Sequence, residues 1–351
     1  MDAHVPAFLI REATMRDHRQ LLSLARELDS INLPTDASEL RDLIERSRRS
    51  FRGRVRERSR AAYLFCAEAA DKGQVVAASL IIGKHGTPEA PHYYLEMDGD
   101  ERYSRTLRKM FRHTYLRLRY SMDGPTEVGG LIVTRAMRGH PERIGKQISW
   151  VRFLYIARHL PRFEPRVLAE MLPPMAADYG NAFWDHYGRR VTGLSFREAD
   201  RLSTHDKEFI RALFPETPLY TFLLPEEVRE ALGAVGENSR GAVRLLEQAG
   251  MKFLGHIDPF DGGPYYGAVT KELTPVRQRT TCVALIGEVP AEERHAWLVA
   301  HENAAGFRAL RADTRVADGT VALAAASLAA LGIKQGARVD VVPLPGSESK
   351  A

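Results

Sequence analysis

The stretch "GGLIVTRAMRGHPERIGKQISW" (residues 129–150) connects an apolar run to a helix-like segment through a basic loop that contains glycine. Backbone N–H groups at a helix start lack acceptors within the helix, and the helix dipole favours anions there. A strand, a loop and a helix in this order can therefore hold a diphosphate. The competing interpretation is a charged turn between a strand and a helix.

The composition describes an ordinary globular protein. The chain has 351 residues, of which 44% are apolar and 27% charged, so we expect a main domain and a smaller one. Cys66 and Cys282 form no CxxC pair, which suits a reducing compartment. No apolar run reaches the roughly 18 residues of a membrane span, and the first residues lack a signal-peptide pattern. We expect a cytoplasmic protein without a membrane partner.

The excess positive charge is concentrated in two Arg-rich stretches, 45–60 and 101–120, in a chain of formal net charge +5. We expect both to be solvated helix faces. The apolar residues of the second stretch would then point inward; they are Leu107, Phe111, Tyr115 and Leu118. Docking of a polyanionic ligand is the alternative. No nucleic-acid partner is expected, because no helix-turn-helix, zinc or RNA-binding signature accompanies the charge.

Hydrophobic patterns around the opening stretch predict an α/β fold. The expected order is a strand near residue 8, helices at 15–30 and 37–51, a hairpin at 61–86, an Arg-rich helix at 101–120, a strand at 127–134 and a helix at 146–160. Strands at 165–172 and 192–199 enclose a short helix at 180–191; a mostly helical region and strands at 252–270 follow. We expect a mixed sheet flanked by helices in residues 1–272, a small β-rich domain in 273–346 and a disordered tail in 347–351.

The loop and the segments around it resemble the GCN5-related acetyltransferase (GNAT) superfamily. "RIGKQI" (143–148) is similar to the second half of its R/Q-x-x-G-x-G/A loop, although Arg143 stands where the first glycine would be. "GNAFWDHYGRR" (180–190) is similar to a late helix that packs beside the pantetheine arm. The resemblance implies an acyl-CoA site with these residues: Leu131, Val133, Arg143, Ile144, Gly145, Lys146, Gln147 and Asn181.

A closer resemblance, to the arginine N-succinyltransferase family, extends nearly end to end. It includes "INLPTDASELRDLIERS", "FWDHYGRR", "FIRALFPETPLYTFLL", "AVRLLEQAGMKFLGHIDPFDGGP" and "ARVDVVPL". It implies transfer of a succinyl group from succinyl-CoA to the α-amino group of arginine. The family's contact on the central strand falls on Leu131. Asp261, Gly262 and Gly263 would help to shape the amine pocket, although a tight turn also explains the glycines.

The departures from the family affect the expected chemistry. The family's proposed proton-donor histidine is Gly236 here, a second histidine is Phe222, and an arginine is Leu172. A Trp, Trp184, also stands where GNAT enzymes usually carry a tyrosine acid. Amine acylation needs a base, donors for the oxyanion and a proton for the thiolate.

The remaining catalytic candidates are Glu170, on a strand that often carries the base, and Glu237, next to the vacant histidine position. Tyr187 and Tyr220 are the nearest tyrosines, and packing is the alternative for both. The twelve histidines show no metal-ligand spacing, so no metal is expected. Two hypotheses remain: an active acyltransferase, with this or another amine or acyl donor, or an acyl-CoA-binding protein without turnover. A homo- or hetero-oligomer is expected.

Overall fold

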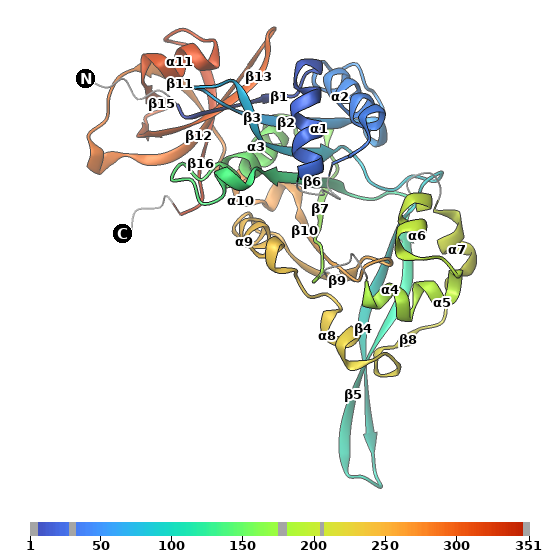
Figure 1. The fold of residues 1–351 in the computed structure, drawn as a ribbon. Helices are drawn as coiled ribbons and strands as arrows, with labels where there is room; N and C mark the ends of the chain where they lie inside the picture. The colour runs from blue at the N-terminus through green and yellow to red at the C-terminus, as the bar shows by residue number, and fades with distance from the viewer. Residues whose placement is uncertain (1–5, 28–32, 175–180, 204–206, 347–351) are drawn as a thin grey trace.

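The computed structural model describes residues 6–27, 33–174, 181–203 and 207–346. In these ranges the strands join into one sheet in the order β14-β15-β11-β16-β12-β13-β1-β2-β3-β6-β7-β10-β9-β4-β5-β8. Figure 1 shows the C-terminal strands at the upper left, the N-terminal body beside them and a long strand pair extending below. The predicted α/β fold, a mixed sheet flanked by helices with a β-rich C-terminal region, is confirmed.

The N-terminal body follows the hydrophobic pattern closely. Its elements are β1 (Phe8–Glu12), α1 (His18–Glu27), α2 (Ala37–Phe51), β2 (Ala62–Ala69), β3 (Gln74–Ile82), β6 (Thr126–Val133), α3 (Ile144–Arg158) and β7 (Arg166–Glu170). Helix α2 begins after Asp36 because the Asp36 side chain accepts hydrogen bonds from the amides of Ser38 and Glu39. Helices α1 and α2 pack on one face of the sheet, and α3 packs on the other.

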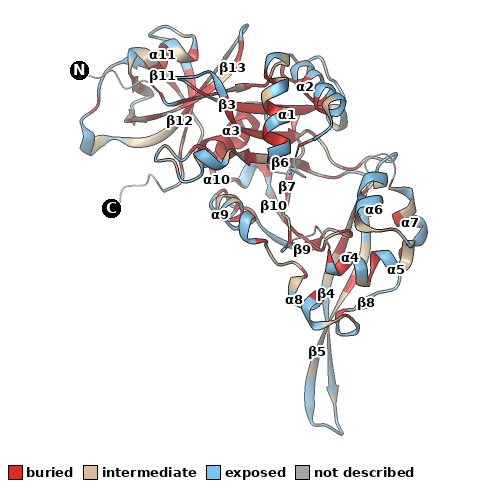
Figure 2. Cartoon of the chain, viewed as in Figure 1, coloured by how far each residue is buried: buried red, intermediate tan, exposed pale blue. Residues whose placement is uncertain are grey.

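Residues 101–120, predicted as a helix, instead belong to a two-stranded ribbon. β4 (His92–Ser104) and β5 (Lys109–Ser121) pair along their full length, and Leu107, expected to face inward, is 66% exposed beside the turn. The helix prediction was wrong because it ignored the partner strand: Arg119 of β5 binds Glu96 of β4, and Tyr115 donates to Asp98. Figure 2 shows that the far end of this ribbon is exposed.

The segment 192–199, predicted as a strand, lies mostly in helices. It spans the end of α5 (Gly188–Thr192) and the start of α6 (Phe196–Ser203). The Ser195 amide and hydroxyl donate to Glu198, whose own amide donates back to the Ser195 hydroxyl. This capping box is present in the sequence as "SFRE" and starts a helix. The strand prediction overlooked it.

The other elements before the C-terminal region are α4 (Ala182–His186), α7 (Glu208–Leu213), β8 (Leu219–Tyr220), α8 (Glu226–Ala231), α9 (Arg240–Gln248), β9 (Lys252–Ile257), β10 (Pro264–Val269) and α10 (Thr274–Gln278). Helices α4, α7 and α8 pack at the base of the ribbon, whereas α9 and α10 pack in the core under α3. Phe183 and Trp184 of α4 and Ile210 of α7 pack with residues of β4 and β9 in a core separate from the one under α3.

The C-terminal strands extend the body's sheet and have a core of their own. They comprise β11 (Thr280–Ile286), β12 (His295–Asn303), β13 (Gly306–Thr314), β14 (Val316–Ala317), β15 (Thr320–Leu323) and β16 (Arg338–Pro343), with α11 (Ala325–Leu331). β13 pairs with β1 in the register Ile10 with Ala309. The predicted tail at 347–351 lies outside the described residues. Among the described helices, none has the length and apolar character to cross a membrane.

Candidate active site

The central strand β6 separates from its parallel neighbour β7 shortly after the two strands begin. They pair at Thr126 with Val167 and at Glu127 with Leu168. β6 then shifts register against β3, and Gly130 adopts a φ of 58°, which a residue with a side chain adopts only at a cost. Leu131 is the next residue after Gly130, and its backbone has no paired partner in β7. An extended amide ligand can pair there as a neighbouring strand would.

A buried arginine of α3 supports this irregular part of β6. Arg152 donates to the carbonyl oxygen of Gly129 at 3.1 Å and to the hydroxyl and carbonyl of Ser149. Burial lowers the pKa of Arg152 to about 9, and no carboxylate pairs with it among the described residues. The guanidinium therefore stabilises a carbonyl that the sheet leaves without a partner.

The start of α3 lies beside the end of β6. Arg143 precedes the helix in the left-handed conformation, with φ 49° and ψ 52°. The amides of Ile144 and Gly145 donate no hydrogen bond to another described residue, whereas the Lys146 amide donates to Arg143. A Cβ atom at Gly145 would lie 3.8 Å from Val133. The predicted loop and the predicted strand residues thus meet, and two helix-start amides remain available to an anion.

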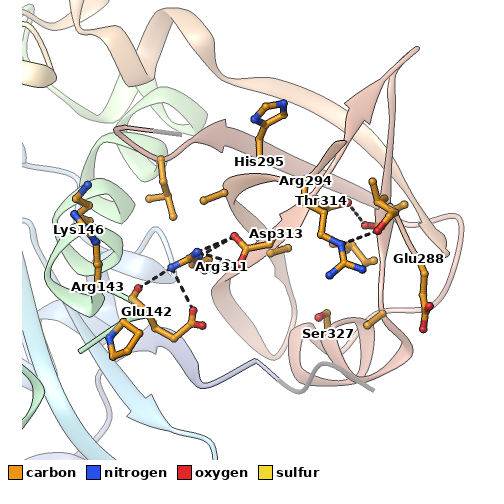
Figure 3. Close-up of a pocket in the computed structure, with 18 of the residues that line it drawn as sticks. Glu142, Arg143, Lys146, Glu288, Arg294, His295, Arg311, Asp313, Thr314 and Ser327 are labelled. Carbon is orange, nitrogen blue, oxygen red and sulfur yellow. Dashed lines mark hydrogen bonds and ion pairs between the residues drawn. The ribbon is translucent and has the colours of Figure 1, made fainter. Parts of the chain in front are cut away.

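A cavity of about 750 Å³ opens beside this helix start. Glu142, Arg143 and Lys146 form one wall, and residues of the C-terminal strands form the other (Figure 3). The predicted loop residues Ile144, Gly145 and Gln147 do not line it. Gln147 is buried and donates to the carbonyl oxygen of Glu142, so its side chain holds the loop in place.

Two histidines and a carboxylate meet on the opposite side of the sheet. His85 follows β3, His92 begins β4 and Glu170 ends β7, and one ligand atom of each lies within 4.8 Å of the others. His85 Nδ1 lies 2.8 Å from Glu127 Oε2, and His92 Nδ1 lies 3.9 Å from Glu170 Oε1. His92 is buried and has no hydrogen-bond partner among the described residues. Such a set can exchange protons or bind a divalent metal.

Burial and neighbouring charges shift the pKa values of this cluster. Burial, followed by the negative charge of Glu127, raises the pKa of Glu170 to about 7. Burial lowers the pKa of His92 to about 2, so its ring is neutral at neutral pH. Although burial acts in the opposite direction, the hydrogen bond with His85 lowers the pKa of Glu127 and Glu127 raises that of His85. Lys207 lies close enough to favour ionised Glu170.

The "DPFDGGP" segment is a tight turn beside Glu170. Asp258 accepts from the amides of Phe260 and Asp261 and from the hydroxyl of Tyr265, and Tyr265 pairs with Glu170 across β10 and β7. Gly262 has a φ of 75°, and a Cβ atom at Gly263 would lie 2.2 Å from the Met171 carbonyl oxygen. Both glycines are therefore required by the turn itself.

Burial also affects the pKa of Asp261, an acidic residue of this turn. Burial and then Asp258 raise the pKa of Asp261 well above its usual value. Asn181 caps α4 by accepting from the Trp184 amide and donates to the Asp261 carbonyl oxygen. Asn181, predicted to contact the cofactor, is thus placed beside the predicted amine pocket and holds its turn.

The other predicted catalytic residues, Tyr220 and Glu237, differ in where they lie. Tyr220 pairs with Tyr115 in the ribbon, and its hydroxyl contacts Asp100 and Arg102. Glu237 is exposed in a short 3₁₀ turn, and its neighbour Gly236 donates to the carbonyl oxygen of Leu172, two residues after Glu170. The structure therefore brings Glu170 and Asp261 together, leaves Tyr220 in the ribbon and places Glu237 next to the segment that follows Glu170.

The position of the missing histidine is closed by backbone. The Gly236 amide donates to the Leu172 carbonyl oxygen, and a Cβ atom at Gly236 would lie 2.6 Å from the Pro173 carbonyl oxygen. Trp184 is fully buried and donates to Leu194, and Tyr187 is buried with its pKa raised to about 12. None of these residues offers a proton donor at this place.

The sequence reasoning missed His85, His92 and Glu127. They lie far apart in the chain and form no motif, so only the pairing of β3, β4, β6 and β7 brings them together. The one available signal was the "TEVGG" start of the central strand, where Glu127 lies directly before an apolar run. Since buried carboxylates need partners, that residue indicated a polar site.

Known proteins similar to the chain cover almost all of it. The family model "Arginine N-succinyltransferase beta subunit" matches residues 8–275, and the model of its C-terminal domain matches 279–343. Arginine N-succinyltransferase subunit beta of Pseudomonas aeruginosa is 30% identical over 96% of this chain and 98% of its own. Arginine N-succinyltransferase of Yersinia enterocolitica is 30% identical over 97% and 99%. The structure of arginine/ornithine succinyltransferase subunit AI from Pseudomonas aeruginosa superposes with a TM-score of 0.82, at 28% identity, over 96% of this chain and 99% of that one.

Proposed function

The chain belongs to the arginine N-succinyltransferase family, and from this premise we propose that it transfers the succinyl group of succinyl-CoA to the α-amino group of arginine. The observation that carries the proposal is the placement of Glu170: a carboxylate with a pKa of about 7 lies where β7 has separated from the central strand. A base at this place can accept the proton of an amine that enters between β6 and β7 from one face of the sheet, while the thioester enters from the other face.

The acyl donor is held by backbone groups on the α3 side of the sheet. The free amides of Ile144 and Gly145 bind the diphosphate. The backbone of Leu131 pairs with the pantetheine amides, and Val133 packs beside them. The thioester then lies in the separation of β6 and β7, because the pantetheine arm follows the strand toward it.

Glu170 acts as the base in this proposal. A carboxylate with a pKa near 7 is half ionised at neutral pH and accepts a proton better than an ordinary glutamate. The neutral, unpartnered His92 lies beside it as a second acceptor. The deprotonated amine attacks the thioester carbonyl, and the C–S bond breaks as the new C–N bond completes. The thiolate takes its proton from solvent, because none of the residues at the position of the missing family acid offers one.

The amine substrate enters from the opposite side, where carboxylates prevail. Asp261 and Glu170 attract its cationic groups, because both are half-buried carboxylates of raised pKa that a cation would stabilise. A second cavity of about 550 Å³ reaches His85 and is lined by Lys84, Lys207 and Arg211. These cations provide a place for a substrate carboxylate, a role for which Leu172 is unsuited.

The test uses the pure chain with succinyl-CoA, arginine and a thiol reagent, and mass spectrometry of the product. We expect thiol release that depends on arginine and an arginine product heavier by one succinyl group. Ornithine, lysine and acetyl-CoA in place of the substrates establish the specificity. Tight CoA binding with no release for any amine would leave only the binding protein without turnover.

Three further features stay predictions. The absence of a metal is checked with a chelator, which should leave the rate unchanged although His85, His92 and Glu170 could bind a cation. An oligomer is expected, and the name of the Pseudomonas aeruginosa relative as a subunit supports it; light scattering of the pure chain measures the mass. A cytoplasmic location and the absence of a nucleic-acid or membrane partner are expected from sequence.

A further inference from the structure

Three side chains of metal-binding type converge on the face of the sheet opposite α3. One ligand atom each of His85, His92 and Glu170 lies within 4.8 Å of the other two. His92 Nδ1 lies 3.9 Å from Glu170 Oε1. Two ligands of one tetrahedral zinc ion, each about 2 Å from the ion, lie roughly 3.3 Å apart. A small movement of these side chains would therefore bring them to metal-binding distance.

His92 is the member of this set that points most directly to a ligand. It is 5% exposed, and its ring has no hydrogen-bond partner among the described residues. Tyr94 and Tyr265 stack on the ring, with centroids 5.7 and 5.4 Å away, and hold its plane. Most buried polar side-chain atoms have a hydrogen-bond partner. A metal ion between His92 and Glu170 would supply the missing partner.

His85 and Glu127 form the arrangement that metal-bound histidines usually have. His85 Nδ1 lies 2.8 Å from Glu127 Oε2. When this nitrogen donates to the carboxylate, Nε2 keeps its lone pair for another ligand. Histidines that bind a metal almost always donate the other ring N–H to a carboxylate, a carbonyl or water, which fixes the ring. Glu127 would thus hold His85 in a tautomer that binds a metal.

Carboxylates outnumber cations around this set. The charges of Glu127 and Asp258 act on Glu170, and Glu170 acts on Asp261. These four carboxylates are half-buried. Lys207 acts on Glu170 with the opposite sign, but one ammonium does not balance four carboxylates. A divalent cation would offset much of this negative charge.

The ion would have a route from solvent and a preferred chemistry. His85 lines the second cavity, of about 550 Å³, so the set is reached from outside. Cys66 and Cys282 are buried, so their thiols are poor competitors for the ion. Two imidazoles and one carboxylate suit Zn²⁺ or Co²⁺, whereas Mg²⁺ and Ca²⁺ prefer oxygen ligands.

We propose that His85, His92 and Glu170 form a site for a divalent transition-metal ion of the Zn²⁺ class, and that the bound ion inhibits acyl transfer. In the proposed function the reaction itself uses no metal. The inhibition rests on that function, because a Glu170 oxygen bonded to the ion cannot accept the proton of the amine. The metal site does not depend on it. Removal of the ion by a chelator restores the rate.

Metal binding is measured first, without turnover. The full chain is freed of metal by dialysis against a chelator and titrated with ZnCl₂ in a calorimeter and with CoCl₂ in a spectrophotometer. We expect one ion per chain and visible absorption bands from the bound Co²⁺. His85→Ala and Glu170→Gln should each weaken Zn²⁺ binding by about a hundredfold or more, and Glu127→Gln by about ten- to a hundredfold. MgCl₂ should bind at least about a hundredfold more weakly than ZnCl₂.

His301→Ala is the matched control, because His301 is a half-buried histidine of β12 outside the set. This variant should bind Zn²⁺ as the wild-type chain does. Thermal unfolding checks that each variant is folded, and Glu170→Gln keeps the size of its side chain, so it tests the site even if His85→Ala does not fold. If the chain binds no ion, or if both variants bind Zn²⁺ as the wild type does, the proposal is overturned, and any binding belongs to other histidines.

Kinetics then test the inhibition. The rate is taken from the mass spectrum of the succinylated product, because the thiol of released CoA itself binds zinc. Zn²⁺ that saturates the site should lower kcat/KM by about 10² to 10⁴, the range expected for loss of a base. His85→Ala should need about a hundredfold more Zn²⁺ for the same loss. An unchanged rate at saturation overturns the inhibition. If Zn²⁺ binds as expected while no amine is succinylated, the metal site holds and the proposed reaction fails.

Discussion

The two ends of the proposed ligand path differ in charge and in the face of the sheet on which they lie. The α3 side carries Arg143 and Lys146 beside free amides, whereas the side opposite α3 carries Glu170 with Glu127. Ala169 packs in the core under α3, so its neighbour Glu170 points to the other face. The separation of β6 and β7 is the passage between them. In the proposed function, the cations beside the phosphates are thus kept away from the carboxylate that accepts the proton.

Each end contains a group whose pKa is shifted in the direction that a ligand would reverse. Burial and neighbouring cations lower the pKa of Lys146, and burial and Glu127 raise that of Glu170. An anion at the first end and a cation at the second would move both pKa values back toward their ordinary range. The predictions below test whether the ends act separately.

The largest effect is expected from Glu170→Gln. Loss of the base should lower kcat/KM by about 10² to 10⁴, and the affinity for CoA should stay the same, because Glu170 lies away from the phosphate end. Steady-state kinetics and calorimetry measure the two quantities. Glu230→Gln, an exposed residue of α8, is the control. If CoA affinity falls together with the rate, the two ends are not independent.

The second prediction concerns pH. Because the pKa of Glu170 is raised to about 7, the fraction of ionised base falls tenfold for each pH unit below that value. The substrate amine is also protonated over this range, because the pKa of an α-amino group lies above 7. A plot of log kcat/KM against pH should therefore have a slope near 2 below pH 7 and near 1 just above it. No limb from His92 is expected, because its pKa is about 2.

Glu170→Gln gives the control for this profile. The variant should retain only the slope near 1 from the substrate amine. A wild-type slope of 1 throughout would show that Glu170 does not accept the proton. A slope of 2 in both proteins would assign the second proton to another group of the cluster.

The α3 end was largely predictable from sequence, whereas the acidic end was only partly so. The loop 143–147 and the strand residues Leu131 and Val133 are close in sequence, so a local pattern specifies their contact. Glu170 was found because it ends a recognisable strand. The proximity of His85 and His92 to Glu170 depends on pairing between strands that are far apart in sequence. No local hydrophobic period indicates such pairing.

The same limit explains the ribbon. When residues 101–120 are considered alone, the spacing of their charges fits a helix. The acidic residues that pair with them in the ribbon lie in the partner strand, at 96–101. The strand prediction for 192–199 failed for a different reason. The capping box that starts the helix 196–203 is present in the sequence as "SFRE" and was overlooked.

A moderate effect is expected from Gly236→His, which places a histidine where relatives are thought to carry one. The new Cβ atom would lie 2.6 Å from the Pro173 carbonyl oxygen, so the backbone must shift, at a cost of about 1 to 3 kcal/mol. Thermal unfolding should show a lower Tm and kinetics no gain in kcat. Gly241→Ala is the matched control: nothing lies within 4 Å of its Cβ position in α9, and Ala should stabilise the helix by about 0.5 to 1 kcal/mol. If the Gly236→His variant keeps the wild-type Tm and has a higher kcat, the acidic end has room for an acid.

The smallest effect is expected from Tyr220→Phe, because Tyr220 belongs to neither end. Its partner Tyr115 lies opposite Asp98 of β4. Asp98 is six residue steps along β4 from His92, about 20 Å at 3.3 Å per residue. Its hydroxyl contacts only Asp100 and Arg102, near the exposed part of the ribbon, so kcat/KM should change less than about twofold and stability by about 0.5 kcal/mol or less. Steady-state kinetics in parallel with Tyr103→Phe, an exposed ribbon tyrosine, gives the comparison. A hundredfold loss of kcat/KM in Tyr220→Phe but not in Tyr103→Phe would show that the Tyr220 hydroxyl takes part in the reaction. The ribbon would then be a third region involved in proton transfer, besides the two ends.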